Sequence, residues 1–178
     1  MNSTRPVFTP LARLLHWLMA ILILAMLFIG AGMVVELSPW HTTLVAVHKP
    51  LGVALLVLAV LRLGVRLRRP APPLPTDMPA WQQCLAHASH VLLYGLMLAM
   101  PLVGWGMLSA GGYPVQLGSA LQLPAIAPHD VQLYAVLRSA HRWLAYLLLA
   151  CVLAHLGAAL FHGLVRRDGV LGSMLGGR

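Results

Sequence analysis

The sequence contains nine histidines, and two of them have a spacing that would place both imidazoles on one side of a helix. His141 and His155 are 14 residues apart, which at 100° per residue is about 40° short of four helical turns. The same 14 residues correspond to a rise of about 21 Å. Histidine is costly within apolar membrane spans and is a functional candidate there. Because neutral imidazoles bind metals, the spacing predicts two cofactor sites at different levels of one helix.

Each of these two histidines needs a second ligand from another segment. His48 is the expected partner of His141, whereas either His16 or His90 could pair with His155. Two axial imidazoles on an iron porphyrin give a low-spin b-type haem suited to electron transfer, because no position at iron stays open. Two pairs about 21 Å apart cannot share one metal, which argues against a haem-free metal site or transporter. The predicted cofactors are two non-covalent haem b groups.

Two glycines and an arginine recur at the same interval of 14 residues. Gly30 follows His16 and Gly104 follows His90 at this distance, so both glycines are expected at the level of the outer haem. A glycine there would let a porphyrin face approach the backbone, although glycines also pack transmembrane helices together. Arg62 lies 14 residues after His48, where it could pair with a haem propionate or mark only the membrane boundary.

The elements that must position these residues are strongly apolar. Of the 178 residues, 60% are hydrophobic and 9% are charged, whereas soluble domains have about 45–50% and about 25%. This composition excludes a soluble enzyme and a disordered chain. Four apolar blocks each approach the roughly 20 residues that cross a bilayer, at about residues 11–35, 44–65, 86–109 and 141–165. We expect an all-α integral membrane protein, a single domain over residues 1–178 that forms a four-helix transmembrane bundle.

The basic residues predict the orientation of this bundle. Nine of them lie before or at the start of the first block, at the end of the second block or after it, or after the fourth block, and only Lys49, Arg138 and Arg142 fall on the other side. The positive-inside rule therefore places both termini in the cytoplasm. With 12 basic and 4 acidic residues arranged between apolar blocks, we expect membrane topology and no nucleic-acid partner. The longest outer connection, residues 111–130, contains Pro and Gly residues that argue against a continuous helix.

Several short motifs resemble the bacterial cytochrome b561 family: Leu15-His16-Trp17, His48-Lys49-Pro50-Leu51-Gly52, His90 with Tyr94, and His141-Arg142 followed by His155 and His162. The resemblance covers nearly the whole chain and implies two haems stacked across the membrane. It implies that His16 and His155 bind the iron of the cytoplasmic haem, and that His48 and His141 bind the periplasmic one. His90 and His162 would then lie near the inner haem, where an imidazole could serve a quinone site.

The resemblance also implies an activity, that of a superoxide:ubiquinone oxidoreductase of the bacterial inner membrane. Lys49, Arg138 and Arg142 would attract superoxide at the periplasmic face, or would only bind lipid headgroups or haem propionates. The electron would pass from the outer haem to the inner one and reduce ubiquinone near His162 and His90. The alternative is an electron-relay subunit that serves a partner dehydrogenase or a periplasmic redox protein through residues 111–130.

Overall fold

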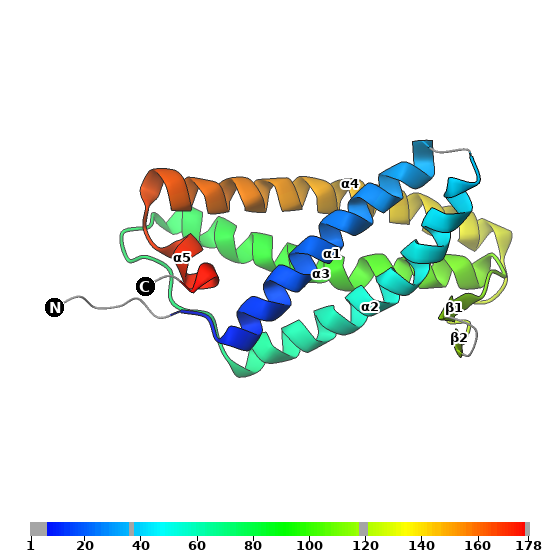
Figure 1. The fold of residues 1–178 in the computed structure, drawn as a ribbon, viewed down its shortest axis with the longest axis horizontal. Coiled ribbons are helices and arrows are strands. Elements are labelled where there is room, and N and C mark those ends of the chain that lie inside the picture. Colours follow the sequence, from blue (N-terminus) through cyan, green and yellow to red (C-terminus); the bar gives the residue numbers. More distant parts are fainter. Residues whose placement is uncertain (1–6, 36–37, 118–120, 177–178) are drawn as a thin grey trace.

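The computed structural model describes residues 7–35, 38–117 and 121–176. In this part of the chain, four helices are long and apolar enough to cross a membrane: α1 (Pro10–Val35), α2 (Trp40–Arg68), α3 (Ala80–Ala110) and α4 (Val131–Leu160), which continues to Arg166. The chain runs up and down, with α2 packed on α1, α3 on α2 and α4 on α3 (Figure 1). The first and last described residues, Val7 and Gly176, lie at the same end of the bundle, which we call the termini end.

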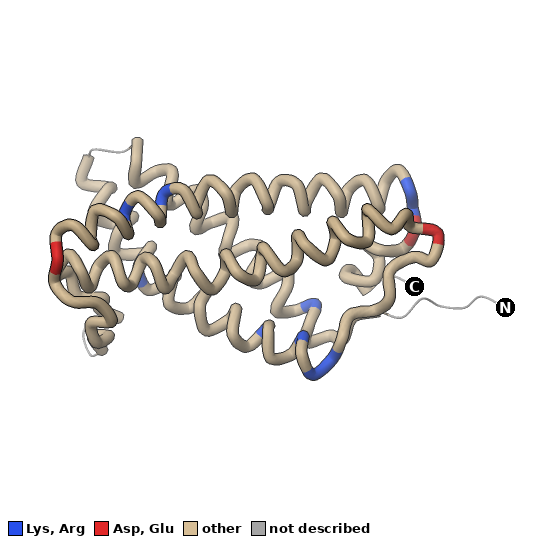
Figure 2. The backbone as a smooth tube through the Cα atoms, turned by 180° about the vertical axis from the view of Figure 1, so that it is seen from behind, with Lys and Arg blue, Asp and Glu red and all other residues tan. Residues whose placement is uncertain are grey.

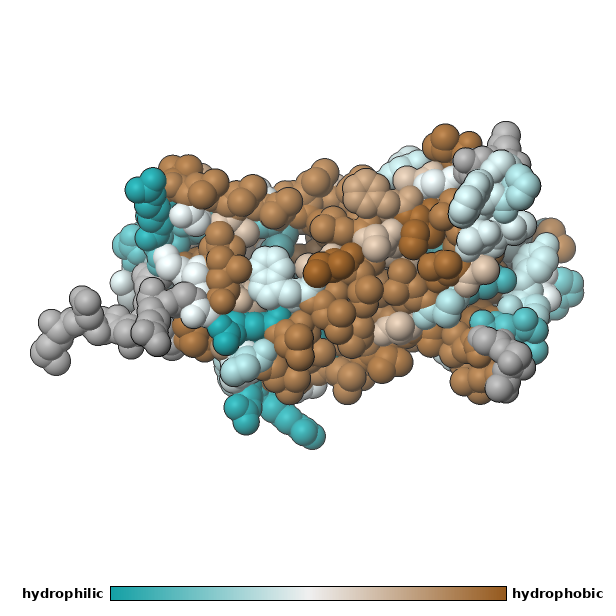
Figure 3. Space-filling model, viewed as in Figure 1, coloured by the Kyte–Doolittle hydropathy of each residue, from teal (hydrophilic) through white to brown (hydrophobic). Residues whose placement is uncertain are grey.

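The surface of the bundle is that of a protein in lipid. Helices of 26 to 31 residues are about 39–47 Å long, which exceeds the roughly 30 Å hydrocarbon core of a bilayer. Large apolar side chains cover their outer faces, for example Phe28 at 77% and Val91 at 73% exposure. Apolar side chains cover most of the middle of the face seen in Figure 3, and the charged positions gather towards the two ends of the bundle (Figure 2). This distribution supports the predicted multi-pass membrane fold.

The fourth helix begins ten residues earlier than the apolar pattern predicts. It starts at Val131, after Asp130, whose Oδ1 accepts a hydrogen bond of 2.7 Å from the Leu133 N–H and caps the helix. Hydropathy missed these turns because Arg138 and Arg142 interrupt the apolar block, yet arginine is a good helix former. The second and third helices also extend beyond their apolar cores, to residues 40 and 80.

The connection between α3 and α4 contains a feature that the sequence pattern did not predict. Two short antiparallel strands, β1 (Val115–Leu117) and β2 (Leu121–Leu123), pair with Val115 opposite Leu123. They are the only strands among the described residues. We call this the hairpin end of the bundle, opposite the termini end (Figure 1). The Pro and Gly residues of this connection predicted that the helix would be interrupted, and the structure has no helix between Ala110 and Val131 among the described residues.

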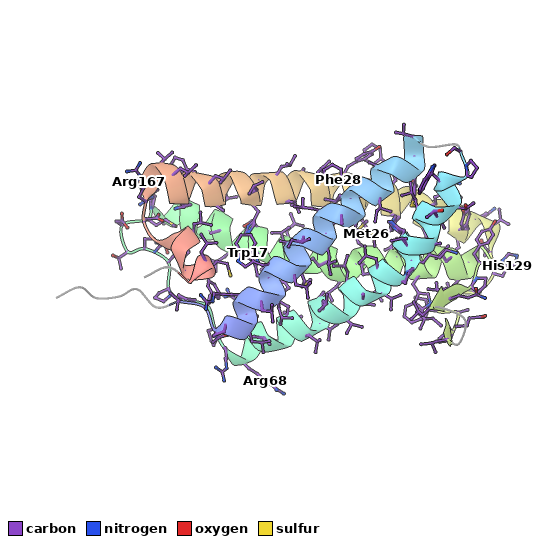
Figure 4. All side chains as sticks on the ribbon, in the orientation of Figure 1. Trp17, Met26, Phe28, Arg68, His129 and Arg167 are labelled. Atoms are coloured by element: carbon purple, nitrogen blue, oxygen red, sulfur yellow. The ribbon has the colours of Figure 1, made fainter. Side chains whose placement is uncertain are left out.

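The last turns of the fourth helix widen before the chain reverses. Residues Phe161–Arg166 form a π-helical segment, η1, and a short helix, α5 (Val170–Leu175), follows after left-handed backbone at Arg167 and Gly169. The α5 helix folds back onto α1, where the Trp17 Nε1–H donates to the Met174 carbonyl at 3.2 Å (Figure 4). These contacts close the termini end of the bundle.

Candidate haem sites

The histidine pair nearer the hairpin end comes from α2 and α4. The ring centroids of His48 and His141 are 6.1 Å apart, and their planes make an angle of 68°. Both residues are partly exposed, but the Nδ1 atom of each ring is buried. Among the described residues, neither Nδ1 atom has a hydrogen-bond partner. The structure therefore brings these two predicted site residues together and leaves a polar atom on each ring unsatisfied.

The two rings fit the donor set of a bis-histidine haem, because no described residue engages the Nδ1 atom of either one. A buried polar atom without a partner is rare in proteins and calls for an explanation such as a bound group. Metal–imidazole bonds of about 2 Å on both sides of one metal place the two ring centroids roughly 6 Å apart, as found for this pair. Two neutral imidazoles facing each other across a helical bundle are suited to axial ligation of haem iron.

Two glycines lie beside this pair. A Cβ atom added to Gly104 of α3 would come within 3.2 Å of the His141 Cε1 atom, which is closer than ordinary contact. A Cβ atom added to Gly30 of α1 would lie 3.9 Å from the His48 Cε1 atom. Both glycines are therefore at the level of the hairpin-end histidines, where a side chain would occupy the space beside an imidazole.

The second group of histidines lies nearer the termini end and contains three rings. The centroid of His155 on α4 is 6.2 Å from that of His16 on α1 and 5.5 Å from that of His90 on α3. His16 and His155 are partly buried, whereas His90 is exposed. Geometry thus keeps both candidate partners of His155 within reach. His16 has the ring separation expected for two ligands of one metal.

Arg62 is a direct neighbour of His16. Its Nη2 atom donates to the His16 Nδ1 atom at 2.7 Å, and its guanidinium lies 5.6 Å from the centre of the Tyr94 ring. A guanidinium has no acceptor, so His16 Nδ1 must offer its lone pair and a neutral ring then carries its proton on Nε2. A metal on Nε2 needs the opposite tautomer. Metal binding through Nε2 therefore requires Arg62 to release His16.

The two histidine groups lie at different levels of the bundle. Among the described residues, no three His, Cys, Asp or Glu side chains are arranged so that they could hold one metal ion together, and this includes the three rings around His155. Because α4 is regular from Val131 to Leu160, its 14-residue interval from His141 to His155 corresponds to a rise of about 21 Å. The arrangement favours two sites at two levels of the bundle, each with a pair of imidazoles.

A network of charged side chains closes the termini end near η1. The His162 Nδ1 atom lies 2.6 Å from the Asp168 Oδ2 atom, which also forms an ion pair with the Arg166 guanidinium, with 3.3 Å between Oδ2 and Nε. The Asp168 Oδ1 atom accepts from the Val170 N–H at 3.2 Å. Burial alone would raise the pKa of Asp168, but hydrogen bonds from His162 and Val170 and the charge of Arg166 outweigh burial and lower it. Asp168 is therefore ionised at neutral pH.

The sequence analysis identified His162 but not its carboxylate partner. The signal was present, since Asp168 is one of only four acidic residues and follows His162 by six positions. In a regular helix, residues six apart lie on different faces, so the pattern predicts no contact. The π-helical segment and the left-handed Arg167 turn the chain back and create it.

Three cations were expected to attract an anion at the opposite end. Lys49 directly follows His48 on α2, while Arg138 and Arg142 lie one turn apart on α4 and are exposed. The Arg142 guanidinium lies 5.9 Å from the Trp143 ring centre. None of the three forms a salt bridge within the described residues. All three are in the halves of their helices nearer the hairpin end.

A bundle of membrane-spanning helices with histidines in facing pairs defines the class of a membrane-bound cytochrome b. The model of the prokaryotic cytochrome b561 family matches residues 7–177. The chain therefore belongs to the prokaryotic cytochrome b561 family, whose members bind haem b and transfer electrons.

Curated relatives agree with this assignment over most of their length. Cytochrome b561 homolog 2 of Escherichia coli is 30% identical over 164 residues, covering 90% of this chain and 87% of the relative. Cytochrome b561 homolog 1 of the same organism is 30% identical and covers 72% of each chain. A protein named probable superoxide oxidase CybB of Yersinia pestis is 30% identical, covering 90% of this chain and 91% of the relative.

Proposed function

We propose that this protein is a superoxide:ubiquinone oxidoreductase of the bacterial inner membrane, with both termini in the cytoplasm. The observation that carries the proposal is the pair of histidine sites at two levels of one membrane bundle, with unpaired cations near one and a titratable network beyond the other. The likeness to the relative named probable superoxide oxidase supports the choice of substrate. The balanced reaction converts two superoxide ions, one ubiquinone and two protons into two O₂ and one ubiquinol.

The proposal assigns four residues to iron. His48 and His141 would hold one haem b, and His16 and His155 the other, which leaves His90 as a neighbour of His155. Each haem, when bound, supplies a one-electron iron couple without an open coordination position. Gly30 and Gly104 would leave room beside the hairpin-end imidazoles. Arg62, once it has released His16, would donate to a carboxylate of the bound haem.

The hairpin end would collect the anionic substrate. Lys49, Arg138 and Arg142 carry three positive charges that no acidic side chain neutralises among the described residues. Such a field raises the rate at which a small anion arrives and loses this effect as salt screens it. No acid–base residue is needed there, because superoxide gives up an electron without a proton.

The termini end would serve the quinone. Reduction of a quinone to a quinol needs two protons from the same side of the membrane, so a proton donor must lie near the bound head group. His162, with its Nδ1 atom on Asp168, is the candidate for this role. His90 is a further imidazole in this half of the bundle, and it is exposed.

The test uses the purified, haem-loaded protein with a steady source of superoxide and a short-chain ubiquinone. We expect superoxide to reduce the haem bands and ubiquinol to form in catalytic amounts. Replacing Lys49, Arg138 and Arg142 together by Gln should lower the rate of haem reduction about 10-fold at low salt and flatten its salt dependence. The matched control replaces Arg66, Arg68 and Arg69 by Gln, which removes the same charge at the termini end.

The outcomes separate the two functions considered from the sequence. Turnover by the isolated protein, with the hairpin-end variant slowed and the control unchanged, supports the oxidase. Haem reduction that reaches quinone only when a copurifying partner protein is added would overturn it in favour of an electron-relay subunit.

A further inference from the structure

The side chain of His162 is fixed by a carboxylate that is itself held in place. Only 14% of the His162 side chain and 7% of the Asp168 side chain are exposed. The Asp168 carboxylate accepts hydrogen bonds from the His162 ring and the Val170 backbone N–H and forms an ion pair with the Arg166 guanidinium. A carboxylate held by two hydrogen bonds and a charge has little freedom to rotate away from the imidazole.

The backbone around this pair is specialised. The π-helical segment η1 carries His162, and such wide turns within helices are frequent at functional sites. Arg167 adopts a left-handed conformation with φ of 51°, which is uncommon for a residue with a side chain. This turn brings the Asp168 N–H back to the His162 carbonyl at 3.4 Å. The two residues are thus joined through backbone and side chain.

Arg166 ties the pair to the rest of the bundle. Besides Asp168, its guanidinium donates to the Asp77 carboxylate at 2.9 Å and to the Gln82 Oε1 atom at 3.1 Å. Asp77 belongs to the connection between α2 and α3, and Gln82 lies in the first turn of α3. Figure 4 shows the labelled Arg167 and Arg68 at this same end of the molecule. The carboxylate is therefore positioned by three separate parts of the chain.

The consequence for the imidazole is a defined proton position. An ionised carboxylate accepts only, so the proton on the His162 ring is held at Nδ1 and the Nε2 atom makes no hydrogen bond among the described residues. When the ring is doubly protonated, the carboxylate also compensates its positive charge. One nitrogen is then reserved for Asp168, and the other is the atom able to exchange a proton with a ligand.

We propose that Asp168 is a positioning residue, which fixes His162 so that its Nε2–H donates a proton to a carbonyl oxygen of a bound quinone. This inference rests on the proposed function for its substrate. The electrons come from two superoxide ions, each of which becomes O₂. His162 donates one proton, regains it from solvent at the termini end and donates again, so that two electrons and two protons complete the quinol. A purely structural role for Asp168, as an anchor for η1 and α5, is the competing account.

The decisive variants are Asp168→Ala, Asp168→Glu and, as a matched control, Asp77→Asn. Asp77→Asn removes the other carboxylate on Arg166 but leaves the His162 contact in place. The first readout is the ¹⁵N spectrum of histidine rings in the reduced, haem-loaded protein, with His162 assigned by comparison with His162→Gln. We expect Nδ1 to carry the proton in the wild type and in Asp77→Asn, and Nε2 to gain it in Asp168→Ala.

The second readout is the oxidation of the pre-reduced protein by short-chain ubiquinone. Partners of functional histidines typically contribute 10- to 100-fold, so Asp168→Ala should lower kcat roughly 10-fold with little change in KM. Asp168→Glu should recover most of this loss, and reduction of the haem bands by superoxide should be unchanged in every variant. A wild-type rate and an unchanged Nδ1 proton in Asp168→Ala would overturn the proposal.

Two other outcomes are also informative. Equal slowing in Asp168→Ala and Asp77→Asn, with the ring proton unmoved, would show that the network only stabilises the fold and would refute the positioning role. If the wild-type protein is not oxidised by ubiquinone at all, the proposed function fails. The ring-proton measurement then decides separately whether Asp168 positions His162.

Discussion

At the scale of single residues, His155 is the side chain with two possible partners. His16 and His90 both bring an imidazole within about 6 Å of its ring, from α1 and α3 respectively. Only His16 of the two is partly buried, and its ring separation of 6.2 Å is nearer to that of two ligands of one metal than the 5.5 Å of His90. His16 also accepts a hydrogen bond from Arg62, and no such bond is found at His90 among the described residues. The arginine must release His16 before a metal can bind that ring through Nε2.

This difference predicts the result of removing each ring. His16→Ala should lose the haem of the termini end, because His155 alone supplies one axial ligand. His90→Ala should keep both haems. Haem content per chain and the low-spin absorption bands measure both outcomes. Loss of a haem in His90→Ala with retention in His16→Ala would reverse the assignment.

The hairpin-end pair provides the complementary case. His48→Ala should lose only the haem of the hairpin end. The haem held by His16 and His155 should stay in place, because the two sites are about 21 Å apart along α4. A variant that retains two bis-histidine haems would contradict the ligand set.

At the scale of elements, α3 contributes space rather than a ligand to the hairpin-end site. Gly104→Ala would place a Cβ atom 3.2 Å from the His141 ring and should lower the occupancy of that haem severalfold. Gly95→Ala is the matched control on the same helix, because nothing lies within 4 Å of the added atom. Haem content after purification is the measurement, and equal losses in the two variants would contradict this account of Gly104.

The short α5 helix is expected to depend on pH through Asp168. The pKa of this carboxyl in the folded protein is below its ordinary value of 3.8, so its contribution to stability is complete above that value. The contribution is lost as pH falls through the lower, folded-state pKa. Amide-exchange protection of α5, corrected for the intrinsic pH effect, should therefore decrease in acid. In Asp168→Asn the protection should be weaker at neutral pH and should not show this decrease.

The elements also show how far the sequence alone could lead. Hydropathy located all four spanning helices, because burial in lipid requires long apolar segments whatever the details of packing. The 14-residue spacing on α4 required only a regular helix, and the structure provides one. Hydropathy could not find the start of α4 at Val131, where Asp130 caps the helix two turns before Arg138.

Contacts created by irregular backbone were beyond the sequence pattern. The pairing of His162 with Asp168 depends on a π-helical segment and a left-handed residue, neither of which has a reliable sequence signal. The choice between His16 and His90 was also open, because periodicity assigns a face to each helix but does not say how two faces meet. The structure shows that the rings of both His16 and His90 lie next to His155, so it narrows the partners of His155 to these two.

At the scale of the whole molecule, the charge distribution predicts how the bundle sits in the membrane. Nine basic residues are assigned to the termini side and three to the opposite side. Two of the nine, Arg5 and Arg178, lie outside the described residues. We expect a fluorescent reporter fused after the C-terminus to be active in the cytoplasm and alkaline phosphatase fused there to be inactive. Fusions that end after Tyr113 should give the opposite pattern. Active alkaline phosphatase at the C-terminus would contradict the orientation and the proposed sides for superoxide and quinone.

The central claim is that one four-helix bundle of this family holds two haems between two pairs of histidines. The most direct measurement is the amount of haem per chain in the purified protein, taken together with its reduced-minus-oxidised spectrum. We expect two non-covalent haem b groups per chain, both low-spin. One haem or none, after reconstitution with excess haem, would contradict the four-ligand assignment and everything proposed from it.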